Sequence, residues 1–247
     1  MKILIHGIMG RMGREVARLA LDGYHGTEGA IGVDTCGALD GVQCFGSLDE
    51  AAGTADVIID FSNHAATPAL AEYAVRTGTP LVIATTGQTD EEIAAIKDAA
   101  KSVPVFFSAN MSLGVALLVE LAKTVARTMP DAEIEIIEKH HNRKLDAPSG
   151  TALMIANAIK TVRPKSTFTL GRSGMAKRMP QEIGIHAIRM GNIVGEHEVI
   201  VGTDTQTITL KHEAHNRALF AEGAIVAAEF LLKQGAGLYT MQDIINF

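Results

Sequence analysis

The segment from Glu138 to Ala152 carries the chain's densest group of residues suited to acid–base chemistry. Two adjacent histidines, His140 and His141, stand at the end of an alternating stretch, and imidazoles donate protons near neutral pH. Arg143 and Lys144 follow and bring positive charge to an otherwise acidic chain, as recognition of a carboxylate requires. We interpret the segment as a proton-donating site for an anionic substrate, with a solvated charged loop as the alternative.

The same segment ends in a predicted helix start. Residues 148–151 read Pro-Ser-Gly-Thr and precede apolar residues at helical spacing as far as Ile159. The unpaired amides of a helix N-terminus bind anions. A dicarboxylate can therefore be held at one end by these amides and at the other by the preceding cations. The alternative is that Ser149 only caps the helix.

The histidines in the second half of the chain suggest a metal site as another alternative. They are His140, His141, His186, His197, His212 and His215. Neighbouring strand residues point to opposite faces, which separates the two adjacent histidines, and the sequence has no Cys/His or His-x-x-x-His spacing beside them. We expect no bound metal.

A glycine-rich turn near the start of the chain predicts dinucleotide binding. Gly7, Gly10 and Gly13 form a G-x-x-G-x-x-G pattern between an apolar strand and a helix. The first glycine of such a pattern permits a tight turn, the second lets a pyrophosphate approach the backbone, and the third lets helix and strand pack closely. Asp34 ends the next strand about 20 residues later, as a ribose-binding carboxylate would. An ordinary turn carboxylate is the alternative for Asp34.

Two later turns, 84–87 and 108–111, follow the predicted fourth and fifth strands. Ligands of open α/β sheets bind at the carboxyl ends of strands, so these turns should line the nicotinamide half of the cofactor. Ordinary strand-to-helix turns are the alternative. The cofactor-binding residues that we predict are Gly7, Ile8, Met9, Gly10, Arg11, Met12, Gly13, Asp34, Ala84, Thr85, Thr86, Ser108, Ala109, Asn110 and Met111.

The elements that position these residues follow from the hydrophobic pattern. Helical patterns alternate with strands in the first half, and one helix begins with a capping box formed by Thr89 and Glu92. The strand-like runs lack polar alternation, which is typical of strands buried on both faces. They lie at residues 2–6, 30–34, 56–61, 80–85 and 104–109. The pattern predicts an α/β domain with a Rossmann-type parallel sheet.

The second half has a different pattern. Polar and apolar residues alternate in four stretches, at 133–138, 183–190, 198–202 and 206–212. With helices at 113–129 and 151–162, this predicts an α+β domain whose open mixed sheet is mostly antiparallel and has one wet face. Residues 165–182 lack periodicity and are predicted to form a long mobile loop. A helix at 218–233 and a short terminal helix complete the chain.

Composition limits the class of protein. The 247 residues are 47% hydrophobic and 20% charged, with a formal net charge of −6. This is enough apolar material for two modest domains, and the chain is too acidic for a duplex nucleic-acid binder. The first residues show no signal-peptide pattern and no run has membrane length. We expect a cytoplasmic protein without membrane or nucleic-acid partners, in which Cys36 and Cys44 have no special role.

These motifs resemble the dihydrodipicolinate reductase family over nearly the whole chain. The most specific is Glu-x-His-His-x-x-Lys-x-Asp-Ala-Pro-Ser-Gly-Thr-Ala at 138–152. The other similar segments are the glycine loop with Arg11 and Met12, Thr85-Thr86-Gly87, Ala109-Asn110-x-Ser112-x-Gly114, residues 191–197 and residues 220–224.

The resemblance implies an architecture and an activity. It implies a homotetramer in which residues 1–111 and 217–247 form the dinucleotide-binding domain. Residues 112–216 would form the substrate-binding and oligomerisation domain. The implied reaction is reduction of 4-hydroxy-tetrahydrodipicolinate, via dihydrodipicolinate, to tetrahydrodipicolinate in diaminopimelate and lysine biosynthesis.

The resemblance also implies residue roles. The cofactor is expected to be NAD(H), NADP(H) or both. Thr35 follows Asp34 where dual-cofactor members often carry arginine, which favours NADH unless Arg11 reaches the extra phosphate of NADPH. His140 and Lys144 match the family's catalytic proton-donating pair. The residues that match its substrate contacts are His141, Lys144, Gly150 and Thr151.

Two other functions fit parts of the pattern. Another two-domain NAD(P)-dependent dehydrogenase would share the first half, but would leave the run from His140 to Thr151 unexplained. A non-catalytic nicotinamide-binding sensor would have no need for clustered histidine, lysine and anion-binding amides.

Overall fold

The computed structural model describes residues 1–53 and 55–245, which divide into two compact units. The first unit comprises Met1–Ser112 and the chain from Ala218 onward, and the second comprises Leu113–Arg217. Residues 246 and 247, which we expected to end the dinucleotide-binding domain, lie outside the described residues. No helix in the described part of the chain is long and apolar enough to cross a membrane.

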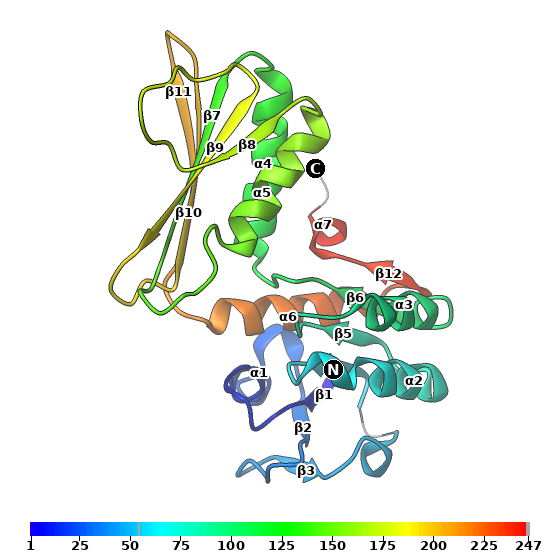
Figure 1. Ribbon diagram of the computed structural model, residues 1–247. Coiled ribbons are helices and arrows are strands. Elements are labelled where there is room, and N and C mark those ends of the chain that lie inside the picture. The colour runs from blue at the N-terminus through cyan, green and yellow to red at the C-terminus, as the bar shows by residue number, and fades with distance from the viewer. Residues whose placement is uncertain (54, 246–247) are drawn as a thin grey trace. The chain divides into compact units, whose positions relative to one another are not determined.

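The first unit is built on a seven-stranded parallel sheet in the order β12-β6-β5-β4-β1-β2-β3 (Figure 1). The strands are β1 (Lys2–His6), β2 (Gly29–Val33), β3 (Gln43–Phe45), β4 (Val57–Asp60), β5 (Leu81–Ile83), β6 (Pro104–Phe107) and β12 (Gly237–Tyr239). The strand order reverses at β1, which lies between β2 and β4, as in a Rossmann fold. The predicted Rossmann-type parallel sheet is confirmed. The two edge strands β3 and β12, of 3 residues each, are too short for the hydrophobic pattern to predict.

Helices flank this sheet in packed pairs, α1 with α6 and α2 with α3 (Figure 1). The helices are α1 (Arg11–Leu21), α2 (Thr67–Thr77), α3 (Asp90–Ala99), α6 (Ala218–Leu231) and α7 (Met241–Ile244), with short turns η1 (Tyr24–Gly26), η2 (Asp49–Ala51) and η3 (His64–Ala66). The capping box of α3 is confirmed, because the Thr89 hydroxyl accepts from the Glu92 amide and the Glu92 carboxylate accepts from the Thr89 amide. The central strands are aliphatic and buried, as strands covered on both faces must be.

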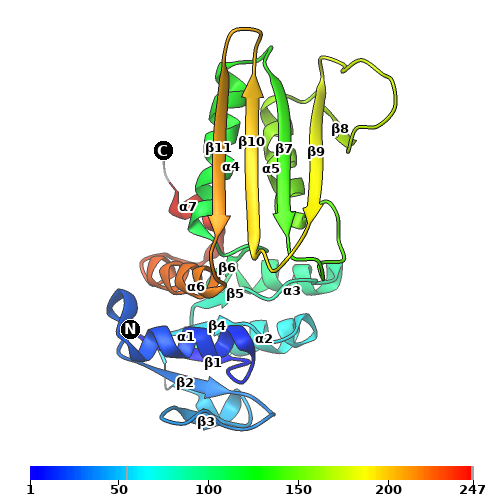
Figure 2. The ribbon, with the colours of Figure 1, turned by 90° about the vertical axis from the view of Figure 1, so that its left-hand side faces the viewer.

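The second unit is a five-stranded sheet in the order β11-β10-β7-β9-β8, with α4 (Leu113–Thr128) and α5 (Gly150–Val162) against one face (Figure 2). The strands are β7 (Glu133–His140), β8 (Thr167–Leu170), β9 (Glu182–Arg189), β10 (Gly195–Gly202) and β11 (Thr207–Ala214). Aliphatic residues of both helices and the covered sheet face form one core. The predicted open mixed sheet is confirmed.

One expectation for this unit was wrong and another was correct only in part. The sheet is not mostly antiparallel, because β7 and β8 both pair with β9 in parallel, and only the β10 pairs with β7 and β11 are antiparallel. Helix α5 and the long segment after β8 return the chain to the same end of the sheet, which permits parallel pairing. The expected loop at 165–182 also contains β8. Arg172 and Arg178 tie the rest of that segment to Glu135 on β7.

Candidate active site

The glycine loop has the geometry that close packing requires. Gly7 follows β1 with a φ of +83°, in the left-handed region, and a Cβ there would lie 2.8 Å from the Cα of Ser62. Gly13, in the first turn of α1, lies so near the loop that a Cβ would be 2.2 Å from the Gly7 carbonyl oxygen. Gly10 is the N-cap of α1. Because a glycine cap has no side chain to bond the first amides of the helix, those amides can bind an anion.

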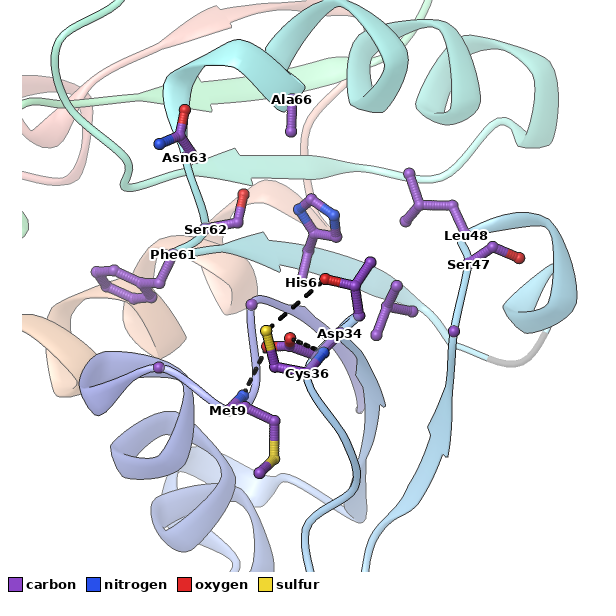
Figure 3. A pocket seen from close by; sticks show the side chains of 15 residues that line it. His6, Met9, Asp34, Cys36, Ser47, Leu48, Phe61, Ser62, Asn63 and Ala66 are labelled. Carbon is purple, nitrogen blue, oxygen red and sulfur yellow. Dashed lines mark hydrogen bonds between the residues drawn. The ribbon is translucent and has the colours of Figure 1, made fainter.

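Asp34 follows β2 and faces the glycine loop (Figure 3). Its Oδ2 accepts a hydrogen bond from the Met9 amide at 2.9 Å, and its Oδ1 accepts one from the Cys36 amide at 2.8 Å. Partial burial opposes ionisation, but these amide donors outweigh that effect and lower the pKa of Asp34. Asp34 is therefore an ionised carboxylate that also holds the loop in place, which the sequence pattern does not indicate.

A cavity of about 640 Å³ lies beside Asp34 at the carboxyl ends of β1, β2 and β4 (Figure 3). The strand order reverses there, and open α/β sheets bind ligands at this position. No lysine or arginine is among its described lining residues. Of the predicted cofactor residues, Gly7, Met9, Gly10 and Asp34 line the cavity. The lining residues that the sequence pattern misses include Thr35, Cys36, Ser47, Phe61, Ser62 and Asn63.

A fully buried carboxylate, Asp60 at the end of β4, connects the strand ends beside this cavity. Its Oδ1 accepts from His6 Nδ1 at 2.8 Å and from the Ser62 hydroxyl at 2.6 Å, and its Oδ2 accepts from the Thr85 hydroxyl at 2.6 Å. His6 and Ser62 both line the cavity, so Asp60 fixes part of its wall. The signal in the sequence is a charged residue that closes an otherwise aliphatic strand.

The remaining predicted cofactor residues lie in the turns after β5 and β6. In the second turn the Ser108 hydroxyl donates to the Asn110 carbonyl at 2.8 Å, and the Asn110 side-chain oxygen accepts from the Ser112 amide at 2.9 Å. Met111 is packed against α6, where a Cβ on Gly223 would lie 1.7 Å from the Met111 carbonyl oxygen. Neither turn is among the described residues that line the cavity, so their contact with a cofactor stays a prediction.

In the second unit, one end of the covered sheet face changes from aliphatic to polar. The buried positions of β7 run from isoleucines to Glu138 and His140. The strand register places Arg189 of β9 opposite His140 and His197 of β10 opposite Glu138. Ser149, the N-cap of α5, contacts two of these side chains. Polar groups from three strands and a helix terminus therefore converge at this end.

Glu138 is fully buried at the centre of this group. His140 Nδ1 donates to its Oε2 at 2.6 Å, Arg189 donates to both carboxylate oxygens at 2.7 Å, and the Ser149 amide donates to Oε1 at 2.9 Å. Burial opposes ionisation, but these donors outweigh it and lower the pKa of Glu138 to about 2. Glu138 is therefore an ionised carboxylate at neutral pH.

His197 packs edge-to-face on His140, with ring centroids 5.2 Å apart. Its Nε2 lies 3.1 Å from the Ser149 hydroxyl oxygen, within hydrogen-bond distance. Burial, helped by the neighbouring His140, lowers the pKa of His197 to about 3, so the ring is neutral at physiological pH. Its Nδ1 is buried and has no hydrogen-bond partner among the described residues.

Lys144 and His141 lie in the loop between β7 and α5, outside the buried group. Lys144 Nζ pairs with Asp146 Oδ1 at 2.8 Å, and this bond is the main cause of the lowered pKa of Asp146. Desolvation and the nearby Arg143 lower the pKa of the half-buried His141. Of the two adjacent histidines, the structure places His140 against the buried carboxylate.

Gly150 and Thr151 are the first residues of α5. Ser149 caps the helix by accepting a hydrogen bond from the Ala152 amide at 3.2 Å, so the helix-cap interpretation of Ser149 is correct, but its amide also donates to Glu138. A Cβ built on Gly150 would meet no other atom within 4 Å, so the helix N-terminus can be approached there. The Gly150 amide donates to the Asp146 carboxylate, so this helix start already holds an anionic group.

Sequence reasoning missed Arg189 and gave Glu138 no role, although both occupy core-facing strand positions where an aliphatic residue is usual. That mismatch is the signal that would have identified them. In the described parts of the chain, no group of three or more His, Cys, Asp or Glu side chains is placed to hold a metal ion.

Comparison with known proteins gives a consistent match over the chain. The family models described as dihydrodipicolinate reductase, N-terminus and C-terminus, match residues 1–111 and 114–245. A protein of Caldanaerobacter subterraneus subsp. tengcongensis named 4-hydroxy-tetrahydrodipicolinate reductase is 47% identical, with 99% of this chain and 98% of that protein covered. A Clostridium novyi protein of the same name is 41% identical, with 99% of this chain and 98% of that protein covered.

Solved structures match in the same way. A dipicolinate-bound dihydrodipicolinate reductase from Paenisporosarcina sp. TG-14 has a TM-score of 0.82 and 25% identity, with 99% of each chain covered. An aspartate dehydrogenase from Thermotoga maritima, with a TM-score of 0.53 and 13% identity over 95% of this chain and 97% of that chain, shares the fold alone.

Proposed function

The chain belongs to the dihydrodipicolinate reductase family, and we propose that it reduces 4-hydroxy-tetrahydrodipicolinate, via dihydrodipicolinate, to tetrahydrodipicolinate in diaminopimelate and lysine biosynthesis. The observation that carries the proposal is the Glu138–His140 pair, which lies beside the N-terminus of α5. It combines a proton donor with an anion-binding helix start, and reduction of a dicarboxylate needs both. A sensor or a dehydrogenase for uncharged substrates needs neither.

The first unit fits a nicotinamide dinucleotide. The Gly10 cap leaves the amides at the start of α1 for a pyrophosphate, and the carboxylate of Asp34 is placed for a ribose. We assign the nicotinamide end to the turns 84–86 and 108–111. When bound, the reduced cofactor supplies a hydride to the substrate.

The second unit holds the substrate and supplies the proton. The 4-hydroxy substrate first loses water to give dihydrodipicolinate. Addition of a hydride to the conjugated cyclic imine then leaves an anion that must take up a proton, so tetrahydrodipicolinate differs from dihydrodipicolinate by one hydride and one proton. His140 donates that proton and is left as a neutral imidazole. Lys144 and the amides at Gly150 and Thr151 bind the two substrate carboxylates, and His141 lines the same loop.

The direct test follows nicotinamide absorbance after addition of enzymatically generated substrate. The protein should oxidise the cofactor, whereas a nicotinamide sensor would bind it and leave the absorbance unchanged. His140→Ala and Lys144→Ala should each lower kcat by about 10²-fold or more. The dissociation constant for the cofactor should stay unchanged, because both residues belong to the second unit. A variant with wild-type kcat at saturating substrate would remove that residue from the mechanism.

For cofactor choice, we propose that NADH binds at least as well as NADPH. The ionised Asp34 repels the extra phosphate of NADPH, and no lysine or arginine is among the described residues that line the cavity. Arg11, in the first turn of α1, can blunt this preference. Asp34→Ser with Thr35→Arg should shift the ratio of dissociation constants toward NADPH by about tenfold or more, because it removes the repulsion and adds a phosphate partner.

Thr35→Arg alone is the matched control for that experiment. It keeps the hydrogen bond between Asp34 and the Met9 amide, so the glycine loop stays in place. A ratio that is unchanged in the double variant, or a wild type that strongly prefers NADPH, would show that other residues select the cofactor.

For assembly, we propose a cytoplasmic homotetramer in which residues 112–216 carry the subunit contacts. One face of the second sheet is covered by α4 and α5, and its other face has no helix of the same unit against it (Figure 2). Three isoleucines lie on that other face among charged residues: Ile137 and Ile200 are partly buried and Ile188 is exposed. Apolar side chains on an open sheet face favour burial against another subunit. Sedimentation analysis at fixed concentration tests the assembly.

A further inference from the structure

We propose that Glu138 and Arg189 are positioning residues that fix His140 in one tautomer, and that Gly195 keeps the space beside the reactive nitrogen open. The inference rests on the proposed function, because it concerns how His140 delivers its proton. Glu138, Arg189 and Gly195 need not touch the substrate, and they act through His140.

The tautomer follows from the charge of Glu138. An ionised carboxylate can only accept hydrogen bonds, so His140 must present a proton on Nδ1 at the 2.6 Å contact. The nitrogen that gains and loses a proton is then Nε2. Arg189 bonds both oxygens of Glu138, and the Ser149 amide bonds one of them, so the carboxylate cannot rotate away from the ring.

The space beside Nε2 depends on Gly195. A Cβ built on Gly195, the first residue of β10, would lie 3.1 Å from His140 Nε2 and 3.5 Å from its Cδ2. The backbone at Gly195 is not left-handed, so local conformation does not require glycine there. The absent side chain instead leaves room at the nitrogen that transfers the proton. His197, two residues further along the same face of β10, packs edge-to-face on the His140 ring and restrains its plane.

The charged and titratable groups around His140 come from every element that packs against it. They are Glu138 on β7, Arg189 on β9, His197 on β10, and His141 and Lys144 in the loop before α5. Among these, only Glu138 is an anion in contact with the ring. Removing its charge therefore disfavours the protonated ring and leaves Arg189 with backbone carbonyl partners only, those of Ile188 and Asp146.

Glu138→Gln tests the positioning role. We expect kcat to fall by about 10²-fold with little change in KM, because the proton donor is affected more than substrate binding. The basic limb of the pH–kcat profile should move to lower pH, because the anion beside the ring is lost. Glu135→Gln is the matched control. It removes a carboxylate from the other face of β7, where the partners are Arg172, Arg178 and His186.

If the basic limb of the pH–kcat profile of Glu138→Gln stays at the wild-type pH, the proposal is overturned. An equal shift of that limb in Glu135→Gln would also overturn it. Should Glu138→Gln fail to fold, the tautomer of His140 in the wild-type protein still tests the role of Glu138, and Gly195→Ala tests the space beside Nε2 without removing a charge. We expect its kcat to fall at least about tenfold because the new methyl crowds Nε2. Gly202→Ala, at the other end of β10, is its control, since its Cβ would lie 3.7 Å from the nearest atom. Equal kcat in the two glycine variants would overturn the role of Gly195.

Nitrogen NMR of histidine-labelled protein separates this inference from the proposed activity. The His140 signals, assigned by their loss in His140→Ala, should show the Nδ1-protonated tautomer in the wild type and a mixture in Glu138→Gln. This readout needs no turnover. A protein that shows the tautomer but never oxidises the cofactor would refute the proposed function alone, whereas an Nε2-protonated ring in an active enzyme would refute the positioning role alone.

Discussion

Replacing His197 with glutamine should make the folded protein less sensitive to acid. Burial lowers the pKa of His197 to about 3 in the folded chain, whereas an unfolded histidine titrates near about 6.5. Between these values the unfolded chain binds a proton that the folded chain does not, so the free energy of unfolding falls as the pH falls. Above this window the residue has no such effect. His197 is only 4% exposed, so solvent does little to screen the effect.

The size of the effect follows from the two pKa values. Lowering the pH from about 8 to about 5 favours the unfolded chain by roughly 2 kcal/mol through this residue alone. Glu138 changes the free energy of unfolding little in that range. Its pKa is about 2 in the folded chain, below the ordinary value of 4.5, so its stabilising effect is lost only as the pH falls below that ordinary value. The pH range therefore isolates the buried histidine from the buried carboxylate.

Urea unfolding at fixed chain concentration measures the effect. The chain contains no tryptophan, so far-ultraviolet circular dichroism is the suitable signal. Glutamine keeps a polar atom for the Ser149 hydroxyl but does not titrate. His25→Gln is the control, because His25 is an exposed histidine paired with Glu229 in the first unit. We expect the wild type and His25→Gln to lose about 2 kcal/mol more between the two pH values than His197→Gln does. An equal loss in all three proteins would refute the reasoning.

The remaining predictions concern the two binding regions. Gly13→Ala should lower the affinity for NADH by about tenfold or more and destabilise the first unit by about 1–3 kcal/mol, because its Cβ would overlap the Gly7 carbonyl oxygen. Fluorescence titration and thermal unfolding measure these changes, and Gly235→Ala, which has open space, should match the wild type. Thr151→Val should raise KM several-fold with little change in kcat, since it removes a contact made equally to substrate and transition state. A loss confined to kcat would contradict that role.

Local pattern determined much of the fold. The aliphatic runs of the first half and the alternating strands of the second half are visible in the sequence, because the two types of sheet expose different faces to solvent. The glycine loop and the capping box at Thr89 and Glu92 are equally local. Their geometry depends on backbone sterics and on hydrogen bonds between near neighbours. The sequence therefore predicted the Rossmann-type sheet, the open mixed sheet and the four predicted residues that line the cavity, Gly7, Met9, Gly10 and Asp34.

Contacts between distant residues were decided by the tertiary structure alone. Glu138 and Arg189 are 51 positions apart, and His6 and Asp60 are 54 positions apart. No periodicity in the sequence reports such a pair, because it depends on strand register and on which strands become neighbours. The parallel pairing of β7 with β9 places Arg189 beside His140, and antiparallel pairing with β10 brings His197 to the same end. The sequence determined which side chains are able to transfer a proton, and strand alternation placed Glu138 and His140 on one face of β7. The register of β7, β9 and β10 decided that Arg189 and His197 join them.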